Sequence, residues 1–348
     1  MRVLVTGGAG FIGSHIAEFY AKNGDDVTVF DNLSRDNLLG KGYGNINYNW
    51  NYLGGFERIK RIKGDVTNFE ETKNVAKDND VIIHVAAQTA VTASLTAPQT
   101  DFATNALGTF NVLEAARISE TNPAIVYTST NKVYGDNINR AKVVEGANRY
   151  AFDETFKSGV SEDFSIDRCE HTPYGCSKLA GDLYAQDYSK TYGLKTGVFR
   201  MSCIYGTRQF GVEDQGWVAW FTIATLTEKP ITLYGDGKQV RDILYVEDLV
   251  RAFDSFIQRN TALSGEVFNI GGGAENTISL LELIALLEQL TGKRSPISYR
   301  DWRPSDQKVY VSNISKARQA LEWTPKVNPM EGVKKLVNWV SKNKSLFN

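Results

Sequence analysis

The run of residues 3–13, Val-Leu-Val-Thr-Gly-Gly-Ala-Gly-Phe-Ile-Gly, constrains the fold more than any other stretch of the chain. An apolar run that starts at Val3 is typical of a buried β-strand. Gly7, Gly10 and Gly13 follow at intervals of three, and apolar residues at helical spacing come after them. Strand, glycine turn and helix in this order bind the pyrophosphate of a dinucleotide, because backbone N–H groups reach the phosphates and the helix N-terminus is partly positive. A plain glycine turn between a strand and a helix is the alternative.

The segment after the glycine turn favours the dinucleotide interpretation. Residues 27–30, Val-Thr-Val-Phe, predict a second strand, and Asp31 stands at its end, eighteen positions after Gly13. An acidic residue at this place accepts hydrogen bonds from the adenosine ribose hydroxyls and repels a 2′-phosphate. The sequence therefore favours NAD over NADP, although Arg35 nearby leaves NADP open.

Composition excludes several classes of partner. Among 348 residues, 39 are basic and 40 acidic, and the isoelectric point is near 6.4, so neither a nucleic acid nor a membrane surface is expected as partner. No apolar run has membrane-spanning length, and the N-terminus leads straight into the first strand. Cys169, Cys176 and Cys203 lack metal-ligand spacing and are too few for a disulfide framework. A cytoplasmic protein without a metal site is predicted.

Further strands and helices alternate along the first half. Residues 58–62, 81–87 and 124–128 predict strands, and residues 101–119 predict a helix. This alternation indicates a doubly wound parallel sheet, whose strands are apolar throughout because both faces are covered. His84 lies inside such a strand and is interpreted as a core histidine.

Small and polar residues follow two of these strands. Ala86 and Ala87 leave room for a cofactor that passes over the strand ends, and Gln88 comes next. The strand at 58–62 is followed by Asp65, which fits either a contact to the adenine amino group or an N-cap of the next helix.

A tyrosine and a lysine carry the predicted chemistry. Tyr174 and Lys178 are four apart, so on a helix they share a face. A lysine ammonium near a phenol lowers the tyrosine pKa, and such a tyrosine exchanges a hydroxyl proton near neutral pH. Thr130, at the end of a predicted strand, shares that proton or positions the substrate. An exposed helix pair is the alternative, but the dinucleotide turn upstream favours catalysis.

These motifs together resemble a known family. The glycine turn, the Asp-Val pair at 65–66, the run Ser-Thr-Asn-Lys-Val-Tyr-Gly-Asp at 129–136 and Tyr174-x-x-x-Lys178 are similar to the extended short-chain dehydrogenases/reductases, which include nucleotide-sugar epimerases and dehydratases. The likeness covers nearly the whole chain. It implies that Thr130, Tyr174 and Lys178 form the catalytic triad.

The resemblance also implies a tightly bound NAD and a set of cofactor contacts, in which Asn105 lies near the nicotinamide half. The implied cofactor-binding residues are Gly7, Gly10, Phe11, Ile12, Gly13, Asp31, Asn32, Ser34, Arg35, Asp65, Val66, Ala86, Ala87, Gln88, Asn105, Ser129, Tyr174 and Lys178.

The second half is expected to bind a nucleotide-sugar. Residues 207–221 are rich in Arg, Gln, Asp and Trp, which suits such a cleft, although an interface or a packed helix start is the alternative. Arg241 fits a bidentate diphosphate clamp or an ion pair with Asp242 or Asp248. The predicted substrate-binding residues are Thr130, Asn131, Arg208, Gln209, Gln215, Gly216, Trp217, Gln239, Arg241, Arg303 and Asp306.

Several tracts resemble one branch of the family. The runs 129–136, 208–210, 214–217 and 237–242, with the long connection from 134 to 174, are similar to epimerases that act at C2 of CDP-linked sugars. Asn131 and Lys132 stand where the 4,6-dehydratases carry an Asp-Glu pair, which argues against dehydration. A UDP-hexose 4-epimerase, a net nucleotide-sugar oxidoreductase and a non-catalytic NAD sensor are the alternatives.

The fold expected from these arguments is α/β: a Rossmann domain over residues 1–202 that binds NAD and carries the Tyr/Lys pair, and a smaller α/β substrate lobe over 203–348, with some chain crossing back. Family analogy implies a homodimer.

Overall fold

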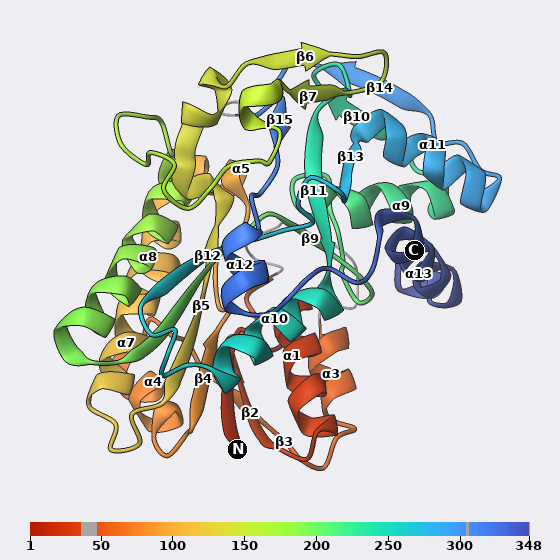
Figure 1. Cartoon of the computed structure of the whole chain (residues 1–348). Coiled ribbons are helices and arrows are strands. Elements are labelled where there is room, and N and C mark those ends of the chain that lie inside the picture. The colour runs from red at the N-terminus through yellow and green to blue at the C-terminus, as the bar shows by residue number, and fades with distance from the viewer. Residues whose placement is uncertain (36–46, 304–305, 348) are drawn as a thin grey trace.

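The computed structural model describes residues 1–35, 47–303 and 306–347. Its largest feature is a seven-stranded sheet in the order β12-β8-β5-β4-β1-β2-β3, in which every neighbouring pair is parallel (Figure 1). The strands are β1 (Arg2–Thr6), β2 (Asp26–Asp31), β3 (Ile59–Lys63), β4 (Val81–His84), β5 (Ala124–Thr130), β8 (Lys195–Met201) and β12 (Glu266–Ile270). The predicted doubly wound parallel sheet is confirmed.

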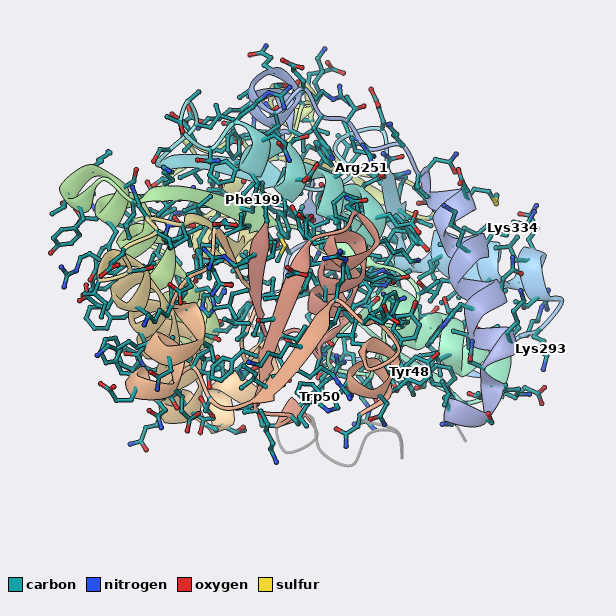
Figure 2. The ribbon with its side chains drawn as sticks, turned by 90° about the horizontal axis from the view of Figure 1, so that it is seen from below. Tyr48, Trp50, Phe199, Arg251, Lys293 and Lys334 are labelled. Atoms are coloured by element: carbon teal, nitrogen blue, oxygen red, sulfur yellow. The ribbon has the colours of Figure 1, made fainter. Side chains whose placement is uncertain are left out.

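Helices cover both faces of this sheet (Figure 1). One face carries α1 (Phe11–Lys22), α3 (Tyr48–Leu53), α10 (Val246–Gln258) and α12 (Ser315–Ala320). The other carries α4 (Phe69–Ala76), α7 (Gly108–Arg117) and α8 (Thr172–Tyr192). Because both faces are covered, the central strands are buried throughout; Phe199, labelled in Figure 2, contacts Phe253, Phe256 and Phe268.

The helix expected over residues 101–119 is interrupted. Two short helices, α5 (Val91–Thr96) and α6 (Pro98–Phe102), lead into a π-helical turn, Ala103–Leu107, and α7 follows it. A π turn inserts one residue into the helical repeat, so it is not visible in the apolar spacing. Its effect is to turn Asn105 into the interior, where the side chain is fully buried.

A second lobe lies over the carboxyl ends of the sheet strands (Figure 1). Its central strand β11 pairs with β9, β13 and β15, and β10 pairs with β14. The strands are β9 (Cys203–Tyr205), β10 (Ile231–Tyr234), β11 (Val240–Tyr245), β13 (Thr277–Ser279), β14 (Ile297–Arg300) and β15 (Val309–Tyr310). The helices α9 (Trp217–Thr227), α11 (Leu280–Thr291) and α13 (Pro329–Lys342) pack on them in a second apolar core.

The chain passes between the lobes in both directions. From the second half, β12, α10 and α12 join the seven-stranded sheet and its cover. From the first half, the hairpin of β6 (Val143–Glu145) and β7 (Tyr150–Phe152) reaches the second lobe, where the Tyr150 N–H donates to the Lys238 carbonyl at 2.9 Å. The boundary expected at residue 202 stays a prediction.

His84 belongs to the core, as predicted. Both ring nitrogens of the buried His84 are hydrogen-bonded, to Thr6 at 2.7 Å and Thr109 at 3.0 Å, and burial lowers its pKa to about 3. The three cysteines are free thiols. Within the described ranges, no helix has the length and apolarity that a bilayer crossing requires, and no three His, Cys, Asp or Glu side chains gather as a metal site.

Candidate active site

The glycine turn lies at the centre of the molecule, between β1 and α1. Gly10 is the N-cap of α1, and the Gly7 N–H donates to the Phe30 carbonyl at 2.8 Å. Gly7 has a φ of +69°, and a Cβ atom there would lie 2.6 Å from the Ala86 backbone. A Cβ at Gly13 would lie 2.4 Å from the Gly7 carbonyl oxygen. The turn thus brings a helix N-terminus to the sheet edge without side chains in between, which fits a bound pyrophosphate.

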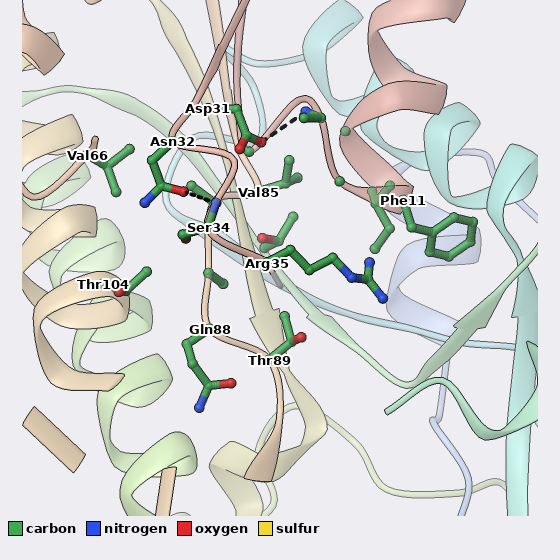
Figure 3. A pocket seen from close by; sticks show the side chains of 18 of the residues that line it. Phe11, Asp31, Asn32, Ser34, Arg35, Val66, Val85, Gln88, Thr89 and Thr104 are labelled. Atoms are coloured by element: carbon green, nitrogen blue, oxygen red, sulfur yellow. Dashed lines mark hydrogen bonds between the residues drawn. The ribbon is translucent and has the colours of Figure 1, made fainter. Parts of the chain in front are cut away.

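Asp31 holds the glycine turn through hydrogen bonds to backbone N–H groups. Its carboxylate accepts the Ala9 N–H at 3.0 Å and the Leu33 N–H at 2.8 Å, and burial raises its pKa above the ordinary value. Figure 3 shows Asp31 at one end of a pocket and Gln88 and Thr89 toward the other. The carboxylate therefore connects the glycine turn to the segment that follows β2, in the place expected for a ribose contact.

The pocket brings together most of the predicted cofactor residues. Those that line it are Gly7, Gly10, Phe11, Ile12, Gly13, Asp31, Asn32, Ser34, Arg35, Val66, Ala86, Ala87, Gln88, Ser129, Tyr174 and Lys178, joined by Gln215 from the predicted substrate set. Sequence reasoning missed other lining residues, among them Val85, Thr89, Thr104 and Met201. Val85, Thr89 and Thr104 lie directly beside predicted residues, which was the available signal, whereas Met201 has no such neighbour.

Tyr174 and Lys178 face this pocket from the first turns of α8. Both are buried, at 9% and 2% exposure, and Thr130 hydrogen-bonds to the Tyr174 hydroxyl. Lys178 Nζ lies 4.4 Å from the centre of the Tyr127 ring. Strand β5 and helix α8 therefore bring the predicted threonine, tyrosine and lysine to one place.

The expected effect of the lysine on the tyrosine is wrong for this structure. Burial raises the pKa of Tyr174 to about 12, and burial also lowers the pKa of Lys178 to about 7, with Asp182 and then Asp101 opposing that decrease. Both charged forms lose hydration in this wall of the pocket, and that loss is the largest cause of each pKa shift.

Ser129 is not a substitute for Thr130. Its hydroxyl donates to Asp182 at 2.6 Å, and Asp182 forms a buried ion pair with Arg200 at 3.0 Å. Because successive side chains of a strand point to opposite faces, the neighbouring hydroxyls of β5 have different partners. Of these two hydroxyls, only that of Thr130 acts on the Tyr174 phenol.

Asn105 lies behind the pocket wall. Its Oδ1 accepts the Gln88 N–H at 2.9 Å, and its Nδ2 donates to Ser177 at 3.1 Å. Asn105 therefore does not line the pocket itself. It holds Gln88, which does.

Asp65 is held by neighbouring side chains. Although burial alone raises its pKa, hydrogen bonds from Asn32 at 2.7 Å and from Thr67 lower that pKa overall. The alternative N-cap role for Asp65 is wrong, since Asn68 caps α4 through the Glu71 N–H.

Arg208 and Gln209 lie outside the pocket lining. The Arg208 guanidinium is 2.7 Å from Glu18 of α1 and stacks 4.5 Å over the Tyr52 ring. Gln209 is 2% exposed and donates to the Ile204 carbonyl. The geometry gives Arg208 a role in joining α1 and α3 to the second lobe, and its predicted substrate contact is not supported by this position.

The cations of the second lobe have acidic partners. Arg241 forms an ion pair with Asp306 at 2.7 Å. The predicted alternative of an ion pair is therefore correct, but its partner is neither Asp242 nor Asp248. Half-buried Lys132 lies near this pair, and loss of hydration, followed by the charge of Arg241, lowers its pKa to about 8. Arg303 pairs with Asp214 at 2.9 Å.

Other predicted substrate residues are bonded within the protein. Asn131 accepts a hydrogen bond from Thr130 at 3.3 Å, Trp217 donates to the Cys203 sulfur at 3.5 Å, and Gln239 donates to the Tyr234 carbonyl. Gly216 is the N-cap of α9, with a φ of 77°.

Arg35 bridges the lobes. Its guanidinium donates to the Phe210 carbonyl at 2.7 Å and to Gln215 at 3.3 Å. The pocket therefore has one wall from each lobe.

Known proteins resemble this chain over its whole length. Residues 3–271 match the NAD dependent epimerase/dehydratase family. The chain is 42% identical to a CDP-paratose 2-epimerase of Salmonella typhi, covering 98% of this chain and 99% of that protein. It is 30% identical to a dTDP-glucose 4,6-dehydratase of Salmonella typhimurium, covering 100% of this chain and 95% of the relative.

A solved structure agrees with this relationship. The UDP-glucuronic acid 4-epimerase from Bacillus cereus, solved in complex with UDP-glucuronic acid and NAD, superposes with a TM-score of 0.82 at 29% identity over 99% of this chain and 100% of that one. The chain belongs to the NAD-dependent epimerase/dehydratase family, and NAD is its cofactor. The predicted family, enzyme class and cofactor are confirmed.

The first prediction concerns the glycine turn. Gly7→Ala places a Cβ against the Ala86 backbone at a left-handed φ, so the purified protein is expected to lose most of its bound NAD. Gly24→Ala is the matched control, since Gly24 also has a positive φ, +89°, with nothing within 4 Å of its Cβ position. That control should lose about 1 kcal/mol of stability and keep its NAD. The measurement is the NAD released from each purified protein on denaturation. A Gly7→Ala protein with full NAD would contradict the assignment of the glycine turn to NAD binding.

Proposed function

We propose that this enzyme epimerises a nucleotide-sugar by transient oxidation, and that its substrate is CDP-paratose, converted at C2 to CDP-tyvelose. The observation that carries the proposal is the 42% identity to a CDP-paratose 2-epimerase over 98% of the chain. The more distant relatives act on UDP- and dTDP-linked sugars by their names. They make a UDP-hexose 4-epimerase the second candidate, whereas the net oxidoreductase is favoured by no residue of the site.

The chemistry starts from an unreactive carbon. A carbinol C–H is not acidic, so inversion of its configuration requires oxidation of the carbinol to a ketone. NAD supplies the acceptor, and later the donor, of the hydrogen that leaves and returns. The residues proposed to hold it are the glycine turn, Asp31 and the small residues after β4, all of which line one pocket. The keto-sugar turns in the cleft and is reduced on its opposite face.

Proton transfer falls to the side chains of β5 and α8. In the proposal, Tyr174 accepts the hydroxyl proton of the sugar and returns it after reduction, and Thr130, hydrogen-bonded to that phenol, orients the sugar hydroxyl. A phenol whose pKa is about 12 needs added positive charge to act near neutral pH. Lys178, one helical turn along α8, would supply it as an ammonium, together with the positive charge that an oxidised nicotinamide would bring.

The nucleotide is proposed to lie against the second lobe. Arg241, Lys132 and Arg303 provide positive charge for a diphosphate, and their acidic partners Asp306 and Asp214 hold them in place. Such a grip lets the sugar turn while the nucleotide stays fixed. Asn131 and Lys132 also replace the Asp-Glu pair of the 4,6-dehydratases, so no carboxylic acid directly follows Thr130 to help eliminate water.

The substrate is tested by incubation with each candidate nucleotide-sugar. Purified enzyme with no added cofactor should convert CDP-paratose to CDP-tyvelose, separated by chromatography, and CDP-paratose should raise the melting temperature more than UDP-glucose or UDP-glucuronic acid. Conversion of a UDP-hexose at C4 with no action on CDP-paratose would replace the first proposal by the second. Stoichiometric release of reduced cofactor would contradict both.

Variants of the triad test the roles. Tyr174→Phe should lower turnover by about 10²-fold or more, because it removes the proton acceptor, and should keep its NAD. Lys178→Met should lose turnover and NAD together. Thr130→Val should also be strongly impaired, since the Ser129 hydroxyl is held by Asp182. The measurement is turnover beside NAD content, with Ser255→Ala as a distant control on α10. Full activity of Tyr174→Phe would refute the mechanism.

We also propose a homodimer, located in the cytoplasm. Large apolar side chains are exposed along α6, α7 and α8: Phe102 at 62%, Phe110 at 36%, Leu183 at 48% and Tyr184 at 46%. Phe110 and Tyr184 contact each other at 5.7 Å, so the two helices share one face. Exposed apolar faces of this kind mark association sites, and a second copy of the same face would bury it. Light scattering should give twice the chain mass, and Leu183→Glu should give a monomer.

A further inference from the structure

A buried carboxylate outside the predicted site lies next to the catalytic lysine. Asp101 is the fourth residue of α6, and its side chain is fully buried. Three neutral groups donate to it: Ser177 Oγ at 2.5 Å, Gln88 Nε2 at 2.9 Å and Asn105 Nδ2 at 3.3 Å. No Arg or Lys forms an ion pair with it within the part of the chain that the structure describes. An unpaired buried carboxylate is costly, which indicates a role beyond packing.

The partners of Asp101 all belong to the walls of the pocket. Ser177 directly precedes Lys178 on α8, and Gln88 lines the pocket after β4. The π-helical turn that follows α6 turns Asn105 into the same cluster. A single carboxylate therefore joins α6, the segment after β4 and the catalytic turn of α8.

Asp101 is also a source of negative charge for the catalytic pair. Its charge opposes the loss of the Lys178 proton and the loss of the Tyr174 proton. Asp182 is the other carboxylate that acts on Lys178, but its charge is shared with Arg200 in an ion pair. The titratable groups that face Lys178 are Asp101 from α6, Tyr174 and Asp182 from α8, Tyr127 from β5 and the neutral His84 from β4.

We propose that Asp101 is a positioning residue of the epimerisation: it keeps Lys178 as an ammonium and fixes Ser177 and Gln88 at the nicotinamide end of the pocket. This inference rests on the proposed function of Tyr174 and Lys178. Asp101 does not touch the reacting atoms; it acts through the lysine and through the pocket wall.

The test is the pH dependence of turnover in Asp101→Asn. Loss of the negative charge favours the neutral lysine and the ionised tyrosine, so both groups release their protons at lower pH. The rising limb, set by Tyr174, and the falling limb, set by Lys178, should therefore both move to lower pH, by roughly one unit. Asp101→Glu, which keeps the charge, should restore the position of the profile. Asp187→Asn, an exposed aspartate on α8, is the matched control and should leave the profile unchanged.

A purely structural role gives a different result. It would lower turnover at every pH without moving either limb, and that outcome for a folded Asp101→Asn overturns the proposal. Asp101→Ser is the second uncharged variant and must show the same displacement. Ser177→Ala, which keeps the carboxylate, should slow turnover without displacing the profile.

The NAD content of the same variants separates this inference from the proposed function. If the wild-type enzyme acts on no nucleotide-sugar, the proposed function fails, and the pH at which NAD is lost on gel filtration then tests Asp101. A lower pH of loss in Asp101→Asn supports the inference, whereas an unchanged pH of loss overturns it.

Discussion

The close approach of Gly7 to Ala86 is the tightest constraint on the glycine turn at this site. At a φ of +69°, the turn after β1 comes so near the end of β4 that a single added methyl group would lie 2.6 Å from the backbone. This contact leaves the N-terminus of α1 open toward the sheet edge, where Asp31 and the small residues after β4 form the walls of one pocket. A side chain at position 7 would separate the turn from the end of β4, and both of these segments line the pocket.

The chemistry of the site depends on burial as much as on spacing. Tyr174 and Lys178 share a helix face, yet the same wall that excludes water favours the neutral form of each. For Lys178, two carboxylates oppose this effect, Asp182 along α8 and Asp101 from α6, whereas the charge of Asp101 raises the Tyr174 pKa further. Added positive charge beside the phenol would favour the ionised form of Tyr174.

The sequence was sufficient for features that are local in the chain. The glycine turn, Asp31 at the end of β2 and the Tyr174/Lys178 pair each depend on neighbours within a few residues or on one helical turn. Together with the alternation of strands and helices, they predicted the parallel sheet and most of the pocket lining.

Features that depend on distant partners were not predictable. Arg208 pairs with Glu18 and Arg241 with Asp306, and no local pattern identifies either partner. Asn105 reaches Asp101 through a π-helical turn that apolar spacing does not reveal. The direction of the Tyr174 pKa shift depends on burial, which helical spacing alone does not give.

Transient oxidation is the central claim, and the fate of one hydrogen tests it most directly. CDP-paratose carrying deuterium at C2 is incubated with the enzyme in ordinary water, and the product is examined by mass spectrometry and NMR. The account predicts that CDP-tyvelose keeps its deuterium at C2, because the hydrogen passes to bound NAD and returns to the same sugar. Loss of the deuterium to solvent during inversion would contradict it.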